Sequence, residues 1–208
     1  KPVTSIIGGS KVSTKINVLL NLSKNTNNLI IVGAMANNFL KFNGLNVGAS
    51  LLEKGTEDII KSIYSSAKKN NCNIIIPIDC VVSNDLNGLP KPKSLNEIKS
   101  EDIILDIGEK TIELINKTVE RSKTVFWNGP AGYFENKNFS KGTLSIAKKI
   151  SSDTETKSLI SIVGGGDTIA ALKNVDFRKV FTHLSTAGGA FLESIEGNEL
   201  PGIKVLKK

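Results

Sequence analysis

Five short runs of apolar, mostly β-branched residues each lead into a glycine-rich stretch, and this recurring unit constrains the fold more than any other feature of the sequence. The five runs occupy residues 3–7, 29–32, 125–127, 159–163 and 180–184. Further apolar runs at 74–78 and 103–105 lack the following glycines. Runs that are apolar throughout are typical of strands buried on both faces of a parallel sheet.

Amphipathic helical patterns fill the intervals between these runs. Ile60 and Ile63 belong to one apolar face, which begins shortly after Thr56, a candidate N-cap residue. A second amphipathic pattern predicts a helix that begins near Glu109. Buried strands that alternate with helices of this length indicate an α/β architecture.

The alternation predicts a single α/β domain over residues 1–208. Its expected form is a doubly wound parallel sheet with helices on both faces, in three layers. Residues 79–102 break the pattern with prolines and polar residues. We interpret this segment as an excursion at the edge of the sheet rather than as a linker between domains.

The glycine-rich strand ends point to a ligand site. In doubly wound folds, ligands bind outside the carboxyl ends of the strands. One glycine between a strand and a helix is commonly a steric accommodation. Five of them at one edge suggest instead a floor of exposed backbone N–H groups and helix N-termini, which would bind anions.

Two familiar phosphate-binding signatures are absent from the sequence. A P-loop needs glycine followed by lysine and then Ser or Thr, and no glycine in this chain precedes a lysine. The dinucleotide fingerprint begins well at Gly164 and Gly166, but its third small position falls on Ile169. These departures disfavour a nicotinamide-dependent dehydrogenase.

Two lysines follow the first glycine pair, Gly8-Gly9. The segment follows a predicted strand and is expected to open a helix, so that Lys11 and Lys15 lie one turn apart on the same face. Their mutual repulsion and the helix dipole make that arrangement mildly unfavourable, by about 0.3–1 kcal/mol, unless an anion binds there. The alternative is that both side chains extend into water.

The later strand ends carry further candidates, each with a plain structural alternative. Asp167 could hold Mg²⁺ or could cap the helix that follows it. Glu135 could accept hydrogen bonds from ribose hydroxyls or could be solvated, and Asn128 could belong to a simple turn. Residues 186–189 could face a transferring phosphoryl group or could serve close helix packing.

Acid–base chemistry has little support in this composition. His183 is the only histidine, and we expect it in a core or edge position of a strand. No Ser/His/Asp or Cys/His arrangement is available without it. Phosphoryl transfer, which depends on positioning and charge neutralisation, fits the residues better.

Composition and charge limit the partners and the cellular compartment that we expect for this chain. The net charge of +7 comes almost wholly from lysine, and aromatic residues make up only 5%, so we expect a solvated basic surface and no nucleic-acid partner. No apolar run approaches a membrane span, and no leader is visible. Cys72 and Cys80 have no metal-ligand spacing, which favours a reducing, cytoplasmic compartment. The sequence begins with Lys1 rather than Met, which is typical of a fragment or of a processed chain.

The ordered motifs closely resemble the C-terminal half of phosphoglycerate kinase, over essentially the whole chain. They are Gly-Gly-Ser-Lys-Val-Ser-Thr-Lys (8–15), Ala-Met-Ala (34–36), Trp-Asn-Gly-Pro (127–130) with Phe134-Glu135, Gly-Gly-Gly-Asp-Thr (164–168), Ser-Thr-Ala-Gly-Gly-Ala (185–190) and Leu-Pro-Gly (200–202). The resemblance implies a Rossmann-like nucleotide-binding domain that acts with Mg²⁺ and ADP or ATP. The reaction it implies is reversible phosphoryl transfer between 1,3-bisphosphoglycerate and Mg-ADP, which gives 3-phosphoglycerate and ATP in glycolysis.

The resemblance also assigns roles to residues of this chain. Metal binding would fall to Asp167, and the transferring group would meet Lys15, Gly188 and Gly189. The nucleotide contacts it implies are Gly9, Lys11, Lys15, Gly33, Leu51, Leu105, Asn128, Glu135, Gly164, Gly165, Gly166, Asp167 and Thr168. Two departures from the family pattern are Val32-Gly33-Ala34 and Ala187-Gly188-Gly189, where the family has glycine triplets.

The resemblance implies that the family's N-terminal domain, which would supply the glycerate site, is absent from this sequence. We therefore expect a monomeric chain that binds Mg-nucleotide but turns over little or no substrate. The alternatives are a nicotinamide-dependent dehydrogenase, a non-catalytic nucleotide-binding or regulatory module descended from the kinase, and a nucleic-acid-binding protein.

Overall fold

The computed structural model describes residues 1–157, 159–173, 180–185, 193, 197 and 201–206. Its main feature is a six-stranded sheet in the order β3-β2-β1-β7-β8-β9, in which every pair of neighbours is parallel. The strands are β1 (Val3–Ile7), β2 (Asn28–Ile31), β3 (Asn73–Ile75), β7 (Thr124–Asn128), β8 (Ile160–Gly164) and β9 (His183–Ser185). The predicted doubly wound parallel sheet is confirmed.

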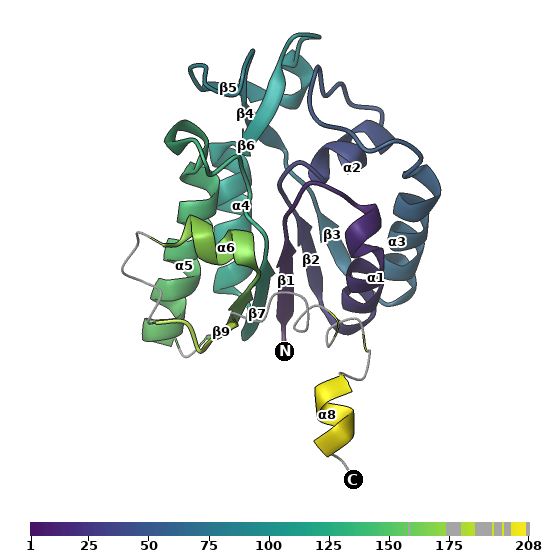
Figure 1. Cartoon of the computed structure of the whole chain (residues 1–208), viewed down its shortest axis with the longest axis vertical. Helices are drawn as coiled ribbons and strands as arrows, with labels where there is room; N and C mark the ends of the chain where they lie inside the picture. Colours follow the sequence, from purple (N-terminus) through teal and green to yellow (C-terminus); the bar gives the residue numbers. More distant parts are fainter. Residues whose placement is uncertain (158, 174–179, 186–192, 194–196, 198–200, 207–208) are drawn as a thin grey trace.

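Helices cover both faces of this sheet. In Figure 1, the first three lie on one side, and the fourth and fifth lie on the other. The described helices are α1 (Ile16–Asn25), α2 (Ala36–Phe42), α3 (Glu57–Lys69), α4 (Glu109–Glu120), α5 (Lys141–Lys157), α6 (Gly166–Ala171) and α8 (Pro201–Leu206), with 3-10 turns η1 (Ser13–Lys15), η2 (Leu95–Glu97) and η3 (Lys137–Phe139). Within the described residues, no helix has both the length and the apolar character that crossing a membrane requires.

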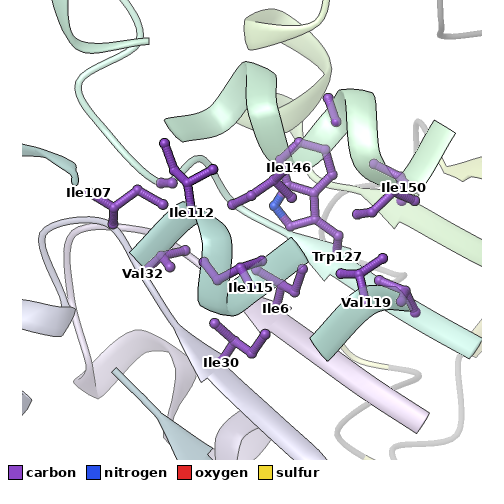
Figure 2. Close-up of a cluster of buried hydrophobic side chains, with 14 of the residues drawn as sticks. Ile6, Ile30, Val32, Ile107, Ile112, Ile115, Val119, Trp127, Ile146 and Ile150 are labelled. Atoms are coloured by element: carbon purple, nitrogen blue, oxygen red, sulfur yellow. The ribbon is translucent and has the colours of Figure 1, made fainter. Parts of the chain in front are cut away.

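Successive residues of the central strands enter two different cores. Ile6, Ile30 and Trp127 pack against α4 and α5, as Figure 2 shows. Their chain neighbours Ile7 and Phe126 pack with α1, α2 and α3 on the opposite face. Because both faces are covered, every position of β1, β2 and β7 after the first is buried, and most of these positions are apolar, which is the pattern that predicted the strands.

The two amphipathic helices form where their patterns predicted them. Helix α4 begins at Glu109, and α3 begins at Glu57 directly after Thr56. Thr56 occupies the N-cap position, but its side chain makes no capping hydrogen bond. Its hydroxyl instead donates at 3.4 Å to Asn38 Oδ1 and to the Glu53 carbonyl oxygen. The predicted N-cap position of Thr56 is therefore confirmed, but the side chain does not make the capping hydrogen bond.

The segment after β3 is more than an edge excursion. It forms a second, antiparallel sheet in the order β5-β4-β6, made by β4 (Asp79–Ser83), β5 (Lys91–Ser94) and β6 (Ile103–Ile107). The run at 103–105 therefore belongs to this small sheet rather than to the parallel one. Figure 1 shows the small sheet beyond the carboxyl ends of the long strands, so it can form one wall of a site there.

Strand β3 is shorter than its apolar run. Pairing ends at Ile75, two residues before Pro77, and Ile78 is 49% exposed. Proline lacks the N–H that a sheet ladder requires, and an edge strand has only one partner to hold it.

Candidate functional site

A cavity of about 470 Å³ lies between the carboxyl edge of the parallel sheet and the small antiparallel sheet. Cavities of this size are typical of small-molecule sites. Among its lining residues are six that the sequence singled out: Gly9, Gly33, Leu51, Leu105, Glu135 and Asp167. Strand ends that are far apart in the chain thus converge on one space.

Lys15 lies where β1 and β7 end. Its Nζ donates to the Gly8 carbonyl oxygen at 2.6 Å and to Asn128 Oδ1 at 2.9 Å. Gly9 has a φ of +136°, and a Cβ at this position would stand 3.2 Å from Lys15 Nζ. The glycine therefore leaves room for the ammonium group between the end of β1 and the cavity.

Burial lowers the pKa of Lys15 to about 8 from its ordinary 10.5, and the negative charge of Asp167 opposes this shift. Within the described part of the chain, no ion pair of Lys15 is present to neutralise its charge. A desolvated ammonium is costly, and a nearby anion would relieve the cost. For Lys15, the alternative of extension into water is wrong.

Lys11 has a different environment. The 3-10 turn begins only at Ser13 and the α-helix at Ile16, so Lys11 precedes both, and its side chain is exposed. Val12, which is fully buried, fixes the chain before the turn. The expectation that the two lysines share one helix face is wrong, because the helix starts later than the pattern implied.

Asn128 and Thr168 are buried and join neighbouring strand ends. Asn128 Nδ2 donates to the Gly164 carbonyl oxygen at 3.0 Å, and the Thr168 hydroxyl accepts from the Gly129 N–H at 2.7 Å. The exposed fractions of these two side chains are 2% and 0%. Both residues therefore shape the loops around the cavity.

The expected floor of exposed amides is only partly present. The N–H of Gly8 donates to the Asn128 carbonyl oxygen at 2.8 Å, and that of Gly33 donates to the Ala131 carbonyl oxygen at 3.2 Å. With Gly129 bonded to Thr168, three of the glycine amides already have partners within the protein. The expectation that they would bind an anion is wrong for these three.

Close backbone contacts explain two of the glycines. A Cβ at Gly8 would lie 2.1 Å from the Pro130 carbonyl oxygen, and one at Gly129, whose φ is +97°, would lie 2.3 Å from the Gly8 carbonyl oxygen. These glycines are steric accommodations. Gly166 differs, because a Cβ there would meet no atom within 4 Å.

Asp167 lies in the first turn of α6, and Gly165, with a φ of +102°, occupies the N-cap position. The interpretation of Asp167 as a cap is therefore wrong. Its side chain is exposed and lines the cavity. The described residues contain no cluster of three or more His, Cys, Asp or Glu side chains that could hold a metal alone. A single carboxylate fits Mg²⁺ that arrives with phosphate oxygens and keeps its waters.

Part of the cavity wall is apolar and includes Leu51 and Leu105. Leu51 is 57% exposed, and its carbonyl oxygen accepts from Asn37 Nδ2 at 3.2 Å. Leu105 lies on β6, and its carbonyl oxygen accepts from the Tyr133 N–H at 2.7 Å, which fixes the loop that carries Glu135. An apolar, flat ring system would fit between these walls.

Sequence reasoning missed Asp106, which also lines the cavity. Its two carboxylate oxygens accept from the Ile107 N–H at 2.9 Å and from the Gly142 N–H at 2.8 Å. Burial raises the pKa of Asp106 to about 7. A carboxylate within the apolar run of residues 103–107 was the available signal.

Two predicted residues, Gly188 and Gly189, lie outside the described residues, as do Thr186 and Ala187. Their proposed approach to a transferring group remains a prediction. His183 lies within the described residues. It is exposed on β9, an edge strand of the sheet, which is one of the two positions predicted for it.

The fold and the site define a class: doubly wound α/β proteins, whose ligand sites lie at the carboxyl edge of the parallel sheet. Comparison with known proteins makes this specific. A family model described as phosphoglycerate kinase matches residues 1–198. The chain belongs to the phosphoglycerate kinase family.

Relatives and solved structures agree with this assignment. A phosphoglycerate kinase from Zymomonas mobilis is 44% identical over 208 residues, which cover 99% of this chain and 52% of that protein. One from Wolbachia pipientis wMel is 43% identical over 210 residues, covering 100% and 53%. The structure of phosphoglycerate kinase from Coxiella burnetii has a TM-score of 0.93 at 39% identity and covers 100% of this chain and 52% of that one. The chain thus spans about half the length of the curated relatives it matches.

Proposed function

We propose that this chain is the C-terminal, nucleotide-binding half of a phosphoglycerate kinase and that its cavity binds ADP or ATP with Mg²⁺. The observation that carries the proposal is the desolvated ammonium of Lys15, which lies beside the cavity without an ion-pair partner among the described residues. A nucleotide phosphate would supply the missing negative charge.

The walls of the cavity suggest the orientation of the nucleotide. The base would lie between Leu51 and Leu105, with the ribose near Glu135. The phosphates would then extend past Gly9 toward Lys15 and Asp167. Asn128 and Thr168, which are buried, would position Lys15 and the loops rather than touch the nucleotide.

The proposed reaction transfers a phosphoryl group between two oxygens that are already ionised. The acyl–phosphate bond of 1,3-bisphosphoglycerate breaks, an oxygen of the terminal ADP phosphate bonds to the phosphorus, and 3-phosphoglycerate leaves as a carboxylate. No proton has to move, so no general base is required. Positive charge that is already in place, at Lys15 and on the metal, would stabilise the charge on the transferring oxygens.

Asp167 would hold Mg²⁺ against the phosphates, and the metal would neutralise part of their charge. The exposed Lys11 would contact the nucleotide phosphates, and Gly188 and Gly189 would face the transferring group once a glycerate-binding half is in place. We propose that this half is an N-terminal domain, without which the chain turns over little substrate. We further propose that the protein acts as a monomer in the cytoplasm, with no nucleic-acid partner.

Isothermal titration calorimetry with Mg-ADP tests the binding site. Lys15→Ala should weaken binding about tenfold or more, because it removes a charge-assisted hydrogen bond. Asp167→Ala should weaken binding only while Mg²⁺ is present. Lys117→Ala, which removes an exposed lysine paired with Glu113 on α4, should change nothing. Equal affinities for all four proteins would refute the proposed site.

An activity assay tests the division into halves. The chain alone should form little ADP from ATP and 3-phosphoglycerate, and adding the N-terminal half of a relative should raise the rate. Rapid turnover by the chain alone would contradict the proposed division of labour.

A further inference from the structure

The loop between α2 and α3 connects the apolar wall of the cavity to the lysine-bearing turn. On one side, two buried asparagines of α2 hold it. Asn37 Nδ2 donates to the Leu51 carbonyl oxygen at 3.2 Å, and Asn38 Oδ1 accepts from the Glu53 N–H at 3.0 Å. The exposed fractions of Asn37 and Asn38 are 1% and 3%. The loop is thus fixed to the end of the sheet through α2.

On its other side, the loop reaches the turn that ends at Lys15. One carboxylate oxygen of Glu53 accepts from the Ser13 N–H at 3.0 Å, and the other accepts from the Ser13 hydroxyl. Ser13 is the first residue of η1, which ends at Lys15. A carboxylate at the start of a helical turn satisfies an amide that has no partner within the turn.

Glu53 has the surroundings of a residue that is held charged. The two hydrogen bonds from Ser13 lower its pKa, and the nearby charge of Lys11 lowers it further. Glu53 is not among the residues that line the cavity and makes no ion pair with Lys15. The carboxylate of Glu53 is thus directed at Ser13, from which it accepts two hydrogen bonds, with the charge of Lys11 nearby.

We propose that Glu53 is a positioning residue for nucleotide phosphates: by holding Ser13 at the start of the turn, it fixes Lys15, and with it Lys11, at the phosphate end of the cavity. This inference rests on the proposed function. Removing Glu53 would free the first residue of the turn while leaving Leu51 held by Asn37. The loss should therefore reach the phosphates and spare the base.

Calorimetry with two ligands, Mg-ADP and adenosine, tests this split. Glu53→Ala should weaken Mg-ADP binding about fivefold, the size expected for losing a helix-end cap, and leave adenosine affinity within twofold of the unmodified chain. Glu53→Gln keeps an acceptor for the Ser13 N–H and should restore most of the Mg-ADP affinity. Glu113→Ala on α4 removes an exposed, ion-paired glutamate and is the matched control.

Each other outcome overturns the inference. An unchanged Mg-ADP affinity in Glu53→Ala means that Glu53 does not position the lysines. Equal losses for Mg-ADP and adenosine mean that it only stabilises the loop. Ser13→Ala provides a second variant. It should also weaken Mg-ADP binding and spare adenosine binding, with a smaller loss of Mg-ADP affinity than Glu53→Ala. If the unmodified chain itself fails to bind Mg-ADP, the proposed function falls and this inference falls with it.

Discussion

The ammonium of Lys15 and the side-chain amide of Asn128 lie 2.9 Å apart, and this hydrogen bond ties together the ends of β1 and β7. Asn128 continues the connection by donating to the Gly164 carbonyl oxygen at the end of β8. Three adjacent strands of the sheet therefore share one buried polar group at their carboxyl edge. The position of the lysine depends on the packing of the sheet as well as on its own loop.

Asn128→Ala tests this dependence. The variant should lose about 1–3 kcal/mol in the free energy of unfolding, because Lys15 and Gly164 both lose a buried hydrogen-bond partner. It should also weaken Mg-ADP binding, since Lys15 loses one of the two hydrogen bonds that hold its ammonium group. Urea denaturation and calorimetry measure the two effects. The exposed Asn87→Ala is the control, and equal stability of both variants would contradict the structural role.

The pKa of Lys15 predicts proton uptake when nucleotide binds. At pH 8 the group is about half protonated, and a bound phosphate would raise its pKa again, so about half a proton should be taken up per nucleotide. Calorimetry at pH 8 in two buffers of different ionisation enthalpy measures this uptake. It should vanish in Lys15→Met, and uptake that persists there would assign the proton to another group.

The same shift has a consequence for the chain without ligand. The folded-state pKa lies below the ordinary 10.5, so between pH 8 and 10.5 the folded chain binds fewer protons at Lys15 than the unfolded chain does. The contribution of Lys15 to stability therefore rises with pH across this window. Comparing the pH slope of unfolding with that of Lys15→Met isolates it.

Asp106 predicts the opposite slope at lower pH. Its folded-state pKa of about 7 lies above the ordinary 3.8, so its contribution to stability is complete below about pH 4 and is lost as pH rises through 7. Urea denaturation between pH 5 and 8 should show this decline in the unmodified chain. Asp106→Asn cannot ionise and should flatten it. An identical slope in both proteins would show that Asp106 does not titrate in this range.

Two glycine substitutions should separate packing from ligand approach. Gly8→Ala places a Cβ against the Pro130 carbonyl oxygen and should cost more than about 2 kcal/mol in the free energy of unfolding. Gly166→Ala places its Cβ in open space at the start of α6, so folding should be nearly unaffected. Its Mg-ADP affinity should fall, because the phosphates would pass this position. Unchanged affinity in Gly166→Ala would place the phosphates elsewhere.

The sequence predicted the parallel sheet well because the signal is local. Each apolar run and the glycine that follows it lie within a few residues of one another, and burial on both faces makes the pattern continuous. The starts of α3 and α4 were predicted for the same reason, since capping positions and apolar spacing occur within one segment. Several of the residues that the family resemblance singled out line one cavity in the structure.

The remainder depends on contacts between distant segments. The antiparallel pairing of β4 with β5 and β6 leaves no periodic signal in residues 79–102. The close contact between Gly8 and Gly129, and the hydrogen bonds of their amides to Asn128 and Thr168, result from the packing of the sheet. The elevated pKa of Asp106 likewise comes from burial, which sequence spacing does not indicate.

A crystal structure of the chain grown with Mg-ADP tests the central claim most directly. The base should lie between Leu51 and Leu105, and the diphosphate should lie within hydrogen-bond distance of Lys15 Nζ, on the Asp167 side of the cavity. Well-defined density for ADP on any other face of the domain, with this cavity empty, would contradict the account.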